Sequence, residues 1–134
     1  MQDRPDAREL LAAVRAFLDE QVVPALDGTR QFHARVAANV LGIVGRELEL
    51  GEAQLRAERD RLAALLGAGP ADHGAGGELA ASVRALNAEL AARIRRGDAD
   101  TEPLRTRVLA HLRATAEERL AIANPRYAGP LANG

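Results

Sequence analysis

The sequence predicts an all-α fold, an antiparallel bundle of four to five helices. Apolar residues recur at intervals of three and four along most of the chain, which is the period of an amphipathic helix. No segment shows the alternation of apolar and polar residues that half-buried strands require. Gly and Pro interrupt the helical pattern at short connections, as expected for a bundle. At 134 residues, we expect a single domain over residues 1–134.

The first helix is expected to begin near Asp6 and to end before Pro24. The segment "DARE" fits a capping box, with Glu9 in the third position after the cap. Pro24 and the following "LDG" end the helix, because proline has no N–H to donate. The stripe expected to be buried comprises Leu10, Leu11, Val14, Phe17, Leu18 and Val22.

The second helix is expected to run from an N-cap at Thr29 to about Leu50, just before Gly51. It carries two kinds of surface. A broad apolar arc, expected to face the core, comprises Phe32, Val36, Val40, Ile43, Val44 and Leu48. A separate small-residue strip comprises Ala34, Ala38, Gly42 and Gly45. Since a glycine inside a helix costs about 1 kcal/mol relative to alanine, the strip predicts close approach of another backbone.

Three further helices are expected at residues 52–66, 78–96 and roughly 102–123. Gly97 closes the second of these, and "NPRY" ends the third because the residue before a proline disfavours the helical conformation. Residues 67–77, "GAGPADHGAGG", are expected to form a flexible Gly-rich loop. The tail after residue 127 is expected to be disordered.

Composition narrows the possible functions. The net charge is −1 and only 2% of residues are aromatic, which argues against nucleic-acid binding. The chain has no cysteine, so thiol catalysis, thiolate metal sites and disulfides are excluded. There is no run of about 18 apolar residues, and the charged start "MQDRPDAREL" does not resemble a signal peptide. We therefore expect a cytoplasmic protein that does not enter membranes.

No arrangement of residues predicts catalysis, a metal or a cofactor. His33 and His111 both lie on apolar helix faces and could bind a metal or relay a proton. Neither follows a glutamate at the Glu-x-x-His spacing of di-iron bundles. We interpret both histidines as buried, hydrogen-bonded structural groups. The Gly-rich loop follows no strand and lacks the Gly-Lys-Ser/Thr ending of a phosphate-binding loop.

A polar stripe on the second helix is the strongest candidate for binding. Arg35, Asn39 and Arg46 share one side, with Gly42 beside them, between the apolar arc and the small-residue strip. One interpretation is a docking strip whose arginine forks bind carboxylates or phosphates of a partner. The other is a solvated face with local ion pairs. At the other end of the chain, Tyr127 is expected to pack back on the bundle.

Three segments, "FHARVAANVLGIVGREL", "LNAELAARIRRG" and "NPRY", resemble a family of small helical bacterial proteins of unknown biochemical role. Its members are encoded beside aminoglycoside-phosphotransferase-like kinases and acyl-CoA dehydrogenases. The resemblance extends from "RPDARELLAAVRAFL" to Tyr127. It implies a non-catalytic accessory subunit of a kinase-like protein that acts on hydroxyacyl-CoA in acyl-CoA catabolism. The positions that match the family pattern are His33, Arg35, Asn39, Arg46, Arg126 and Tyr127.

The expected partner-binding residues are therefore Arg35, Asn39, Gly42, Arg46, Arg126 and Tyr127, with His33 and His111 as structural polar groups. Two alternatives remain open. In the first, the chain is a self-assembling bundle with a scaffold role, in which Ala34, Ala38 and Gly42 pack against a second copy. In the second, His33 and His111 belong to a ligand-binding or catalytic bundle.

Overall fold

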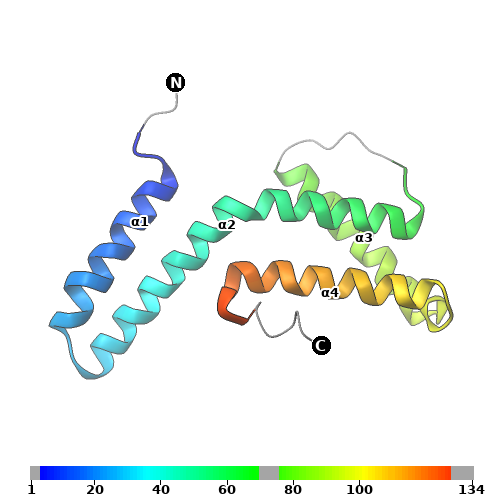
Figure 1. The fold of residues 1–134 in the computed structure, drawn as a ribbon. Coiled ribbons are helices and arrows are strands. Elements are labelled where there is room, and N and C mark those ends of the chain that lie inside the picture. Colours follow the sequence, from blue (N-terminus) through cyan, green and yellow to red (C-terminus); the bar gives the residue numbers. More distant parts are fainter. Residues whose placement is uncertain (1–3, 70–75, 128–134) are drawn as a thin grey trace. The chain divides into compact units, whose positions relative to one another are not determined.

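The computed structural model describes residues 4–69 and 76–127 (Figure 1). In this part of the chain every regular element is helical and no strand occurs, which confirms the predicted all-α bundle. The α-helices are α1 (Ala7–Phe17), α2 (Gly28–Leu66), α3 (Gly77–Arg95) and α4 (Leu104–Ala123). Most of the predicted Gly-rich loop, at residues 70–75, and the tail after residue 127 lie outside the described residues.

Contacts along the chain divide it into two compact units, which meet within α2. Unit 1 is Met1–Gly51 and contains α1 with the first part of α2. Unit 2 is Glu52–Gly134 and contains the rest of α2 with α3 and α4. Each unit is described by itself below. The expectation of a single domain over residues 1–134 stays a prediction.

The start of α1 confirms the predicted capping box. The Asp6 carboxylate accepts hydrogen bonds from the backbone N–H groups of Arg8 and Glu9, both at 2.9 Å, and the Glu9 carboxylate accepts from Asp6 N–H at 2.8 Å. These bonds satisfy donors that have no partner inside the helix. After Phe17 the chain continues through a π-helical turn, Leu18–Val22, and a 3-10 turn, Val23–Ala25, that contains Pro24.

Helix α2 is longer than predicted. It runs without interruption over 39 residues, so the expected break at Gly51 is wrong. A glycine costs a helix only about 1 kcal/mol, and Gly51 does not adopt the left-handed conformation that Gly67 takes just after the helix end. The predicted N-cap at Thr29 is also wrong, because the helix begins one residue earlier, at Gly28.

In unit 1, α1 packs on the small-residue strip of α2. Ala34, Ala38 and Gly42 are buried, as expected for a strip that lets another backbone approach. The side chain of Gln31 also joins α2 to the 3-10 turn that precedes it, because its Nε2 donates to the carbonyl of Val23 at 3.0 Å.

The predicted apolar arc of α2 is not buried, which corrects the expected core. The exposed fractions of Phe32, Val36, Val40, Val44 and Leu48 are between 41 and 61%. On α1, the stripe expected to be buried is also open at Leu10, Val14 and Phe17, at 50–53%. The reason is that α1 lies on the side of α2 that carries the small residues. The large apolar side chains of α2 therefore point outward.

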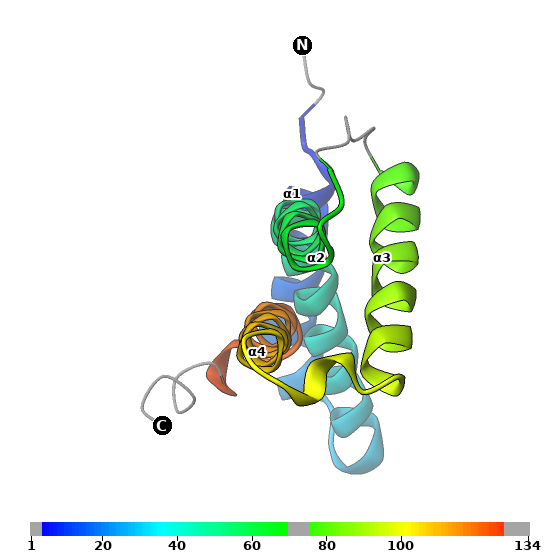
Figure 2. The same cartoon turned by 90° about the vertical axis from the view of Figure 1, so that its right-hand side faces the viewer.

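Unit 2 has the better-formed apolar core. Leu62 and Leu79 are almost fully buried, and a cluster from all three helices surrounds Leu62, namely Leu65, Val83, Leu90 and Val108. Hydrogen bonds of α4 to α2 join Arg61 to Glu118 and Ala64 to Arg107, so α4 runs against the direction of α2. Figure 2 looks along α4 and the end of α2, whereas α3 lies across them.

The ends of α3 and α4 follow the predicted signals. Gly97, with φ of +85°, closes α3 in the left-handed conformation that glycine adopts at little cost. Asn124 ends α4, and its N–H donates to the carbonyl of Leu120 at 2.8 Å. Tyr127 follows in the 3-10 turn η4, Pro125–Tyr127, and is 64% exposed, so the prediction that it packs back on the bundle is wrong.

No helix among residues 4–69 and 76–127 has the length and apolarity needed to cross a bilayer.

Candidate functional site

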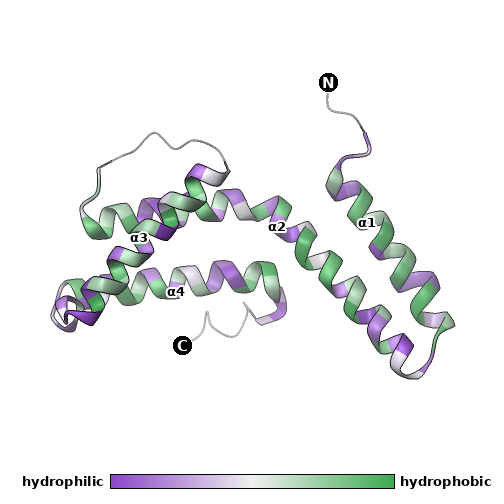
Figure 3. Cartoon of the chain, turned by 180° about the vertical axis from the view of Figure 1, so that it is seen from behind, coloured by the Kyte–Doolittle hydropathy of each residue, from purple (hydrophilic) through white to green (hydrophobic). Residues whose placement is uncertain are grey.

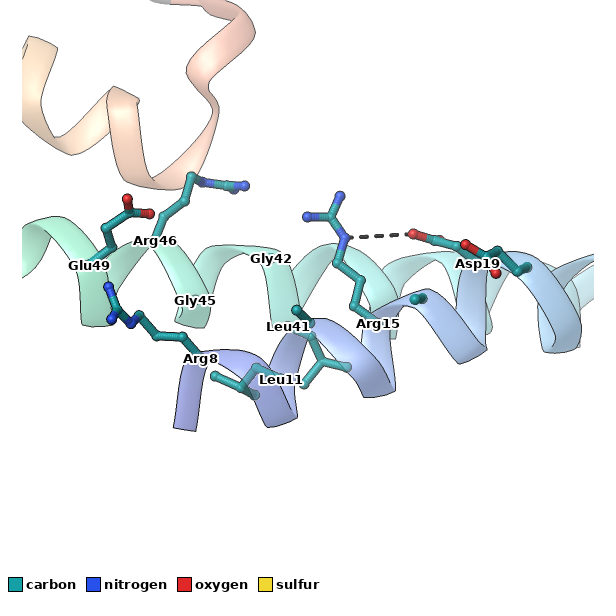
Figure 4. A pocket seen from close by; sticks show the side chains of 12 residues that line it. Arg8, Leu11, Arg15, Asp19, Leu41, Gly42, Gly45, Arg46 and Glu49 are labelled. Atoms are coloured by element: carbon teal, nitrogen blue, oxygen red, sulfur yellow. Dashed lines mark ion pairs between the residues drawn. The ribbon is translucent and has the colours of Figure 1, made fainter. Parts of the chain in front are cut away.

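In unit 1, α1 and the first part of α2 form a helical hairpin. A groove runs between these two helices on one side of the hairpin (Figure 4). Its volume is about 490 Å³. Apolar and small side chains line its floor, and charged side chains stand at its rim. The lining residues are Arg8, Leu11, Ala12, Arg15, Ala16, Asp19 and Glu20 from the first helical segment, and Leu41, Gly42, Gly45, Arg46 and Glu49 from α2.

Gly42 lets the side chain of Arg15 lie across α2. A Cβ atom built at position 42 would be 2.7 Å from Nη1 of Arg15 and 3.4 Å from Nη1 of Arg46. Both guanidinium groups therefore lie over the same point of the α2 backbone. In Figure 4 Arg15 and Arg46 project on the same side of the hairpin, from different helices.

Gly45 forms an open part of the groove floor. A Cβ atom at this position would meet nothing within 4 Å. The described structure therefore gives no packing reason for a glycine here, although glycine costs a helix interior about 1 kcal/mol relative to alanine. A reason that remains is approach of a second molecule to the exposed backbone of α2.

The rim of the groove carries both signs of charge. Arg15 pairs with Asp19 at 3.6 Å, one turn further along, and both side chains are about half exposed. Such exposed pairs contribute little to stability, because solvent screens them and two flexible side chains must be ordered. Arg8, Arg46, Glu20 and Glu49 complete the charged rim. This arrangement can recognise a polar surface, since arginine forks bind carboxylates in a defined geometry.

The structure brings together only some of the predicted partner-binding residues. Gly42 and Arg46 line the groove. Arg35 and Asn39 are exposed on the same edge of α2, outside the groove lining. Arg126 and Tyr127 belong to unit 2 and are exposed in η4. Sequence reasoning missed the wall contributed by Arg8 and Arg15, because helical periodicity does not show which side chains of a neighbouring helix face a given strip.

His33 is not the buried structural group that the sequence predicts. It is exposed on α2, and its ring lies beside that of Phe32, with 5.8 Å between the ring centroids. The prediction is wrong because it assumed a buried apolar arc, and the arc faces outward. His33 belongs to unit 1 and His111 to unit 2.

His111, in contrast, is buried in unit 2, with only 4% of its surface exposed. The predicted hydrogen bond is missing at one nitrogen, since Nδ1 has no partner among the described residues. Burial lowers the pKa of His111, and the positive charge of Arg61 lowers it further, while Glu58 and Glu118 act in the opposite direction. The neutral imidazole is therefore favoured inside the unit.

A cluster of charged residues surrounds His111 between α2 and α4. Arg61 donates to both carboxylate oxygens of Glu118, at 2.8 and 2.6 Å, and this bonding raises the pKa of Arg61. Glu58 is 7% exposed and accepts a hydrogen bond from Asn87 Nδ2 at 2.9 Å. No group of three His, Cys, Asp or Glu side chains among the described residues is arranged to hold a metal ion. The cluster joins α2 to α3 and α4 in unit 2, but it leaves Nε of Arg61 and Nδ1 of His111 buried without a hydrogen-bond partner among the described residues.

Sequence reasoning missed the members of this cluster, namely Glu58, Arg61, Asn87 and Glu118. The spacing of apolar residues did indicate one member of the cluster, Glu58. Leu55, Leu62 and Leu65 recur at helical spacing, and Glu58 lies three residues after Leu55 and four before Leu62. A carboxylate on a buried stripe predicts a buried polar contact, although the partner on another helix cannot be identified from spacing.

The comparisons with known proteins concern mainly the part of the chain that contains α2, α3 and α4. A family model described as "Domain of unknown function (DUF6285)" matches residues 24–127. The chain belongs to this family. The DUF6285 match includes the floor of the groove, at Gly42 and Gly45, and the polar cluster around His111. Helix α1, which supplies the wall with Arg8 and Arg15, precedes the matched residues. No curated protein and no solved structure matches the chain.

Proposed function

We propose that this protein is a cytoplasmic, non-catalytic accessory subunit that binds another protein through the groove of unit 1. The observation that carries the proposal is the open glycine floor at Gly45, flanked by the arginines over Gly42. A bare stretch of helix backbone between two arginines is suited to a protein surface that comes close and presents a carboxylate.

The proposed partner is an aminoglycoside-phosphotransferase-like kinase that acts on hydroxyacyl-CoA in acyl-CoA catabolism. Support for its identity comes from the family resemblance of "FHARVAANVLGIVGREL" and "NPRY". In the proposed complex a partner side chain occupies the floor at Gly45, beside Leu41 and Leu11. A partner carboxylate meets Arg15 and Arg46 above Gly42. The groove supplies binding and orientation, and the partner supplies the chemistry.

The experiment is co-expression with the proposed kinase-like partner, followed by size exclusion with light scattering. A joint peak whose mass equals the sum of the two proteins is expected. Gly45→Leu fills the floor and should abolish the joint peak. Ala13→Leu is the matched control, since Ala13 is exposed on α1 and does not line the groove.

Charge reversal at the rim gives a second comparison. Arg46→Glu should weaken the complex, whereas Arg95→Glu, at an exposed position on α3 of unit 2, should leave it unchanged. Circular dichroism of each variant shows whether the helices are retained. Separate elution of the two unmodified proteins, with kinase activity independent of the small protein, would contradict the proposal.

The self-assembly alternative needs a different surface from the one predicted. Ala34, Ala38 and Gly42 are already buried in unit 1, where α1 covers them. A second copy therefore cannot pack on this strip unless α1 leaves it. Another face of the same helix is better suited to self-association.

A further inference from the structure

The face of α2 that points away from α1 carries an exposed row of large apolar side chains. We name this the α2 row; it comprises Phe32, Val36, Val40, Val44 and Leu48, each 41–61% exposed. A shorter α1 row comprises Leu10, Val14 and Phe17, each 50–53% exposed. Figure 3 shows apolar segments along both helices of the hairpin. Two helices form only one layer, and a stable fold packs such apolar faces against a second layer.

The exposed area of the α2 row is that of an interaction surface of modest size. Side chains of this size have roughly 150–200 Å² of total surface each, so its five half-exposed residues present on the order of 400–500 Å². Specific complexes bury about 800 Å² per partner, so the residues that flank the row supply the remainder of the interface. Single exposed apolar residues need no explanation, whereas a row of this extent marks an interaction surface.

The α2 row is symmetric about Val40, which indicates what covers it. If two copies of α2 lie antiparallel with Val40 opposite Val40, then Val36 meets Val44 and Phe32 meets Leu48. Every apolar residue of the row thus has an apolar counterpart from the other copy. Rows spaced every four residues also form the ridges that interlock in the commonest class of helix packing.

Polar side chains beside the row are complementary in the same register, because an imidazole N–H can donate a hydrogen bond to a carboxylate. His33 and Glu47 are both exposed, and each lies seven residues from Val40 on opposite sides of it. Seven residues are close to two helical turns, so both side chains lie on the side of α2 that carries Val40. Antiparallel pairing therefore places His33 of each copy beside Glu47 of the other. A parallel pair would instead set Glu47 against Glu47.

We propose that unit 1 forms a two-fold symmetric homodimer through the α2 row, with Val40 at the symmetry axis. The interface is isologous, since the same residues contribute from both copies. It lies on a different side of α2 from the small-residue strip and does not use the groove floor at Gly45. The homodimer is independent of the proposed kinase complex, because its test uses the isolated protein.

The absence of cysteine from the chain permits a direct test of the register. Val40→Cys places one thiol beside its own counterpart, within reach of a disulfide. Under mild oxidation this variant should form a covalent dimer at least about tenfold faster than Ala110→Cys, an exposed position on α4, because pairing raises the local thiol concentration. An equimolar mixture of Phe32→Cys and Leu48→Cys should give mainly the mixed dimer.

Light scattering of the full chain should give twice the monomer mass at tens of micromolar. Val40→Glu should shift this mass to the monomer while the helical circular dichroism is retained. His33→Glu should weaken the dimer, and adding Glu47→Arg to it should restore the dimer.

Either of two results would overturn the proposal. One is a monomeric mass at high concentration, with Val40→Cys no faster to cross-link than Ala110→Cys. This result would mean that another part of the chain, or a different protein, covers the row. The other is a dimer whose mass survives Val40→Glu, which would place the contact elsewhere.

Discussion

The guanidinium group of Arg15 lies over Gly42, with Nη1 only 2.7 Å from the point where a Cβ atom would stand. A side chain of α1 thereby rests on the backbone of α2, inside the groove that we propose as the binding site. Gly45, three residues along the same helix, has no such neighbour. Replacing each glycine by alanine therefore separates the effect of helix propensity, which is common to both positions, from the effect of packing, which differs between them.

Gly45→Ala should stabilise the isolated protein. The new methyl group meets no atom within 4 Å, so the change keeps the full gain in helix propensity, about 0.5–1 kcal/mol in the free energy of unfolding. Gly42→Ala should gain less, because the methyl group displaces the Arg15 side chain. Urea unfolding of both variants measures the difference. Equal effects at the two positions would contradict the close contact of Arg15 with Gly42.

Glu118→Gln should destabilise unit 2 by about 1–2 kcal/mol, because it removes the charge from the paired hydrogen bonds with Arg61. Both side chains are only about a quarter exposed, so solvent screens the pair weakly. Glu117→Gln on the same helix is the control. Its pair with Arg113 is about half exposed, and we expect a loss below about 0.5 kcal/mol. Similar losses in thermal unfolding for both variants would argue against the partly buried bridge.

Asn87→Asp should be more destabilising than Asn87→Ala at neutral pH. Asn87 donates to the buried carboxylate of Glu58, and an aspartate would place a second negative charge there. The alanine variant loses one hydrogen bond, a change of about 1–3 kcal/mol when the remaining group is buried. Urea unfolding of both variants at pH 7 measures the difference in the free energy of unfolding.

The stability of unit 2 should fall as the pH is lowered through the titration of His111. Burial and then Arg61 hold the pKa of His111 below its ordinary value of 6.5. Below pH 6.5 His111 is therefore protonated more in the unfolded chain than in the folded unit, and unfolding becomes more favourable. The contribution is fully present above pH 6.5 and is lost as the pH falls through the lowered pKa.

Replacement of each histidine tests whether His111 causes this pH dependence of stability. Between pH 7.5 and 5.5, His111→Gln should lose part of the pH dependence of unfolding seen in the unmodified protein. His33→Gln, at an exposed position in unit 1, should retain it. An identical pH dependence in all three proteins would show that groups other than His111 cause the change.

Much of the secondary structure could be predicted because its determinants lie within a few residues of each other. The capping box joins Asp6 to Glu9, and Gly97 and Asn124 end helices through bonds to the preceding turn. The N-cap expected at Thr29 and the break expected at Gly51 are exceptions. A local signal worth about 1 kcal/mol did not interrupt a 39-residue helix whose neighbouring turns remain hydrogen-bonded.

The candidate site could be predicted only in part. Gly42 and Arg46 were identified because a glycine inside a helix and an arginine beside it are visible in one segment. The opposite wall, with Arg8 and Arg15, comes from another helix and could not be assigned by spacing. The same holds for the buried cluster, where Glu58 meets Asn87 across 29 positions of sequence.

By itself, the sequence determined which segments are helical and which residues share a face, since both follow from the 3.6-residue period and from caps within one turn. Only the tertiary structure decided which face is covered. The arc at Phe32, Val36 and Val40 is the more apolar face of α2, yet α1 lies on the strip of Ala34, Ala38 and Gly42. Small residues allow the two backbones to approach closely, and the larger side chains then remain outside, available to another molecule.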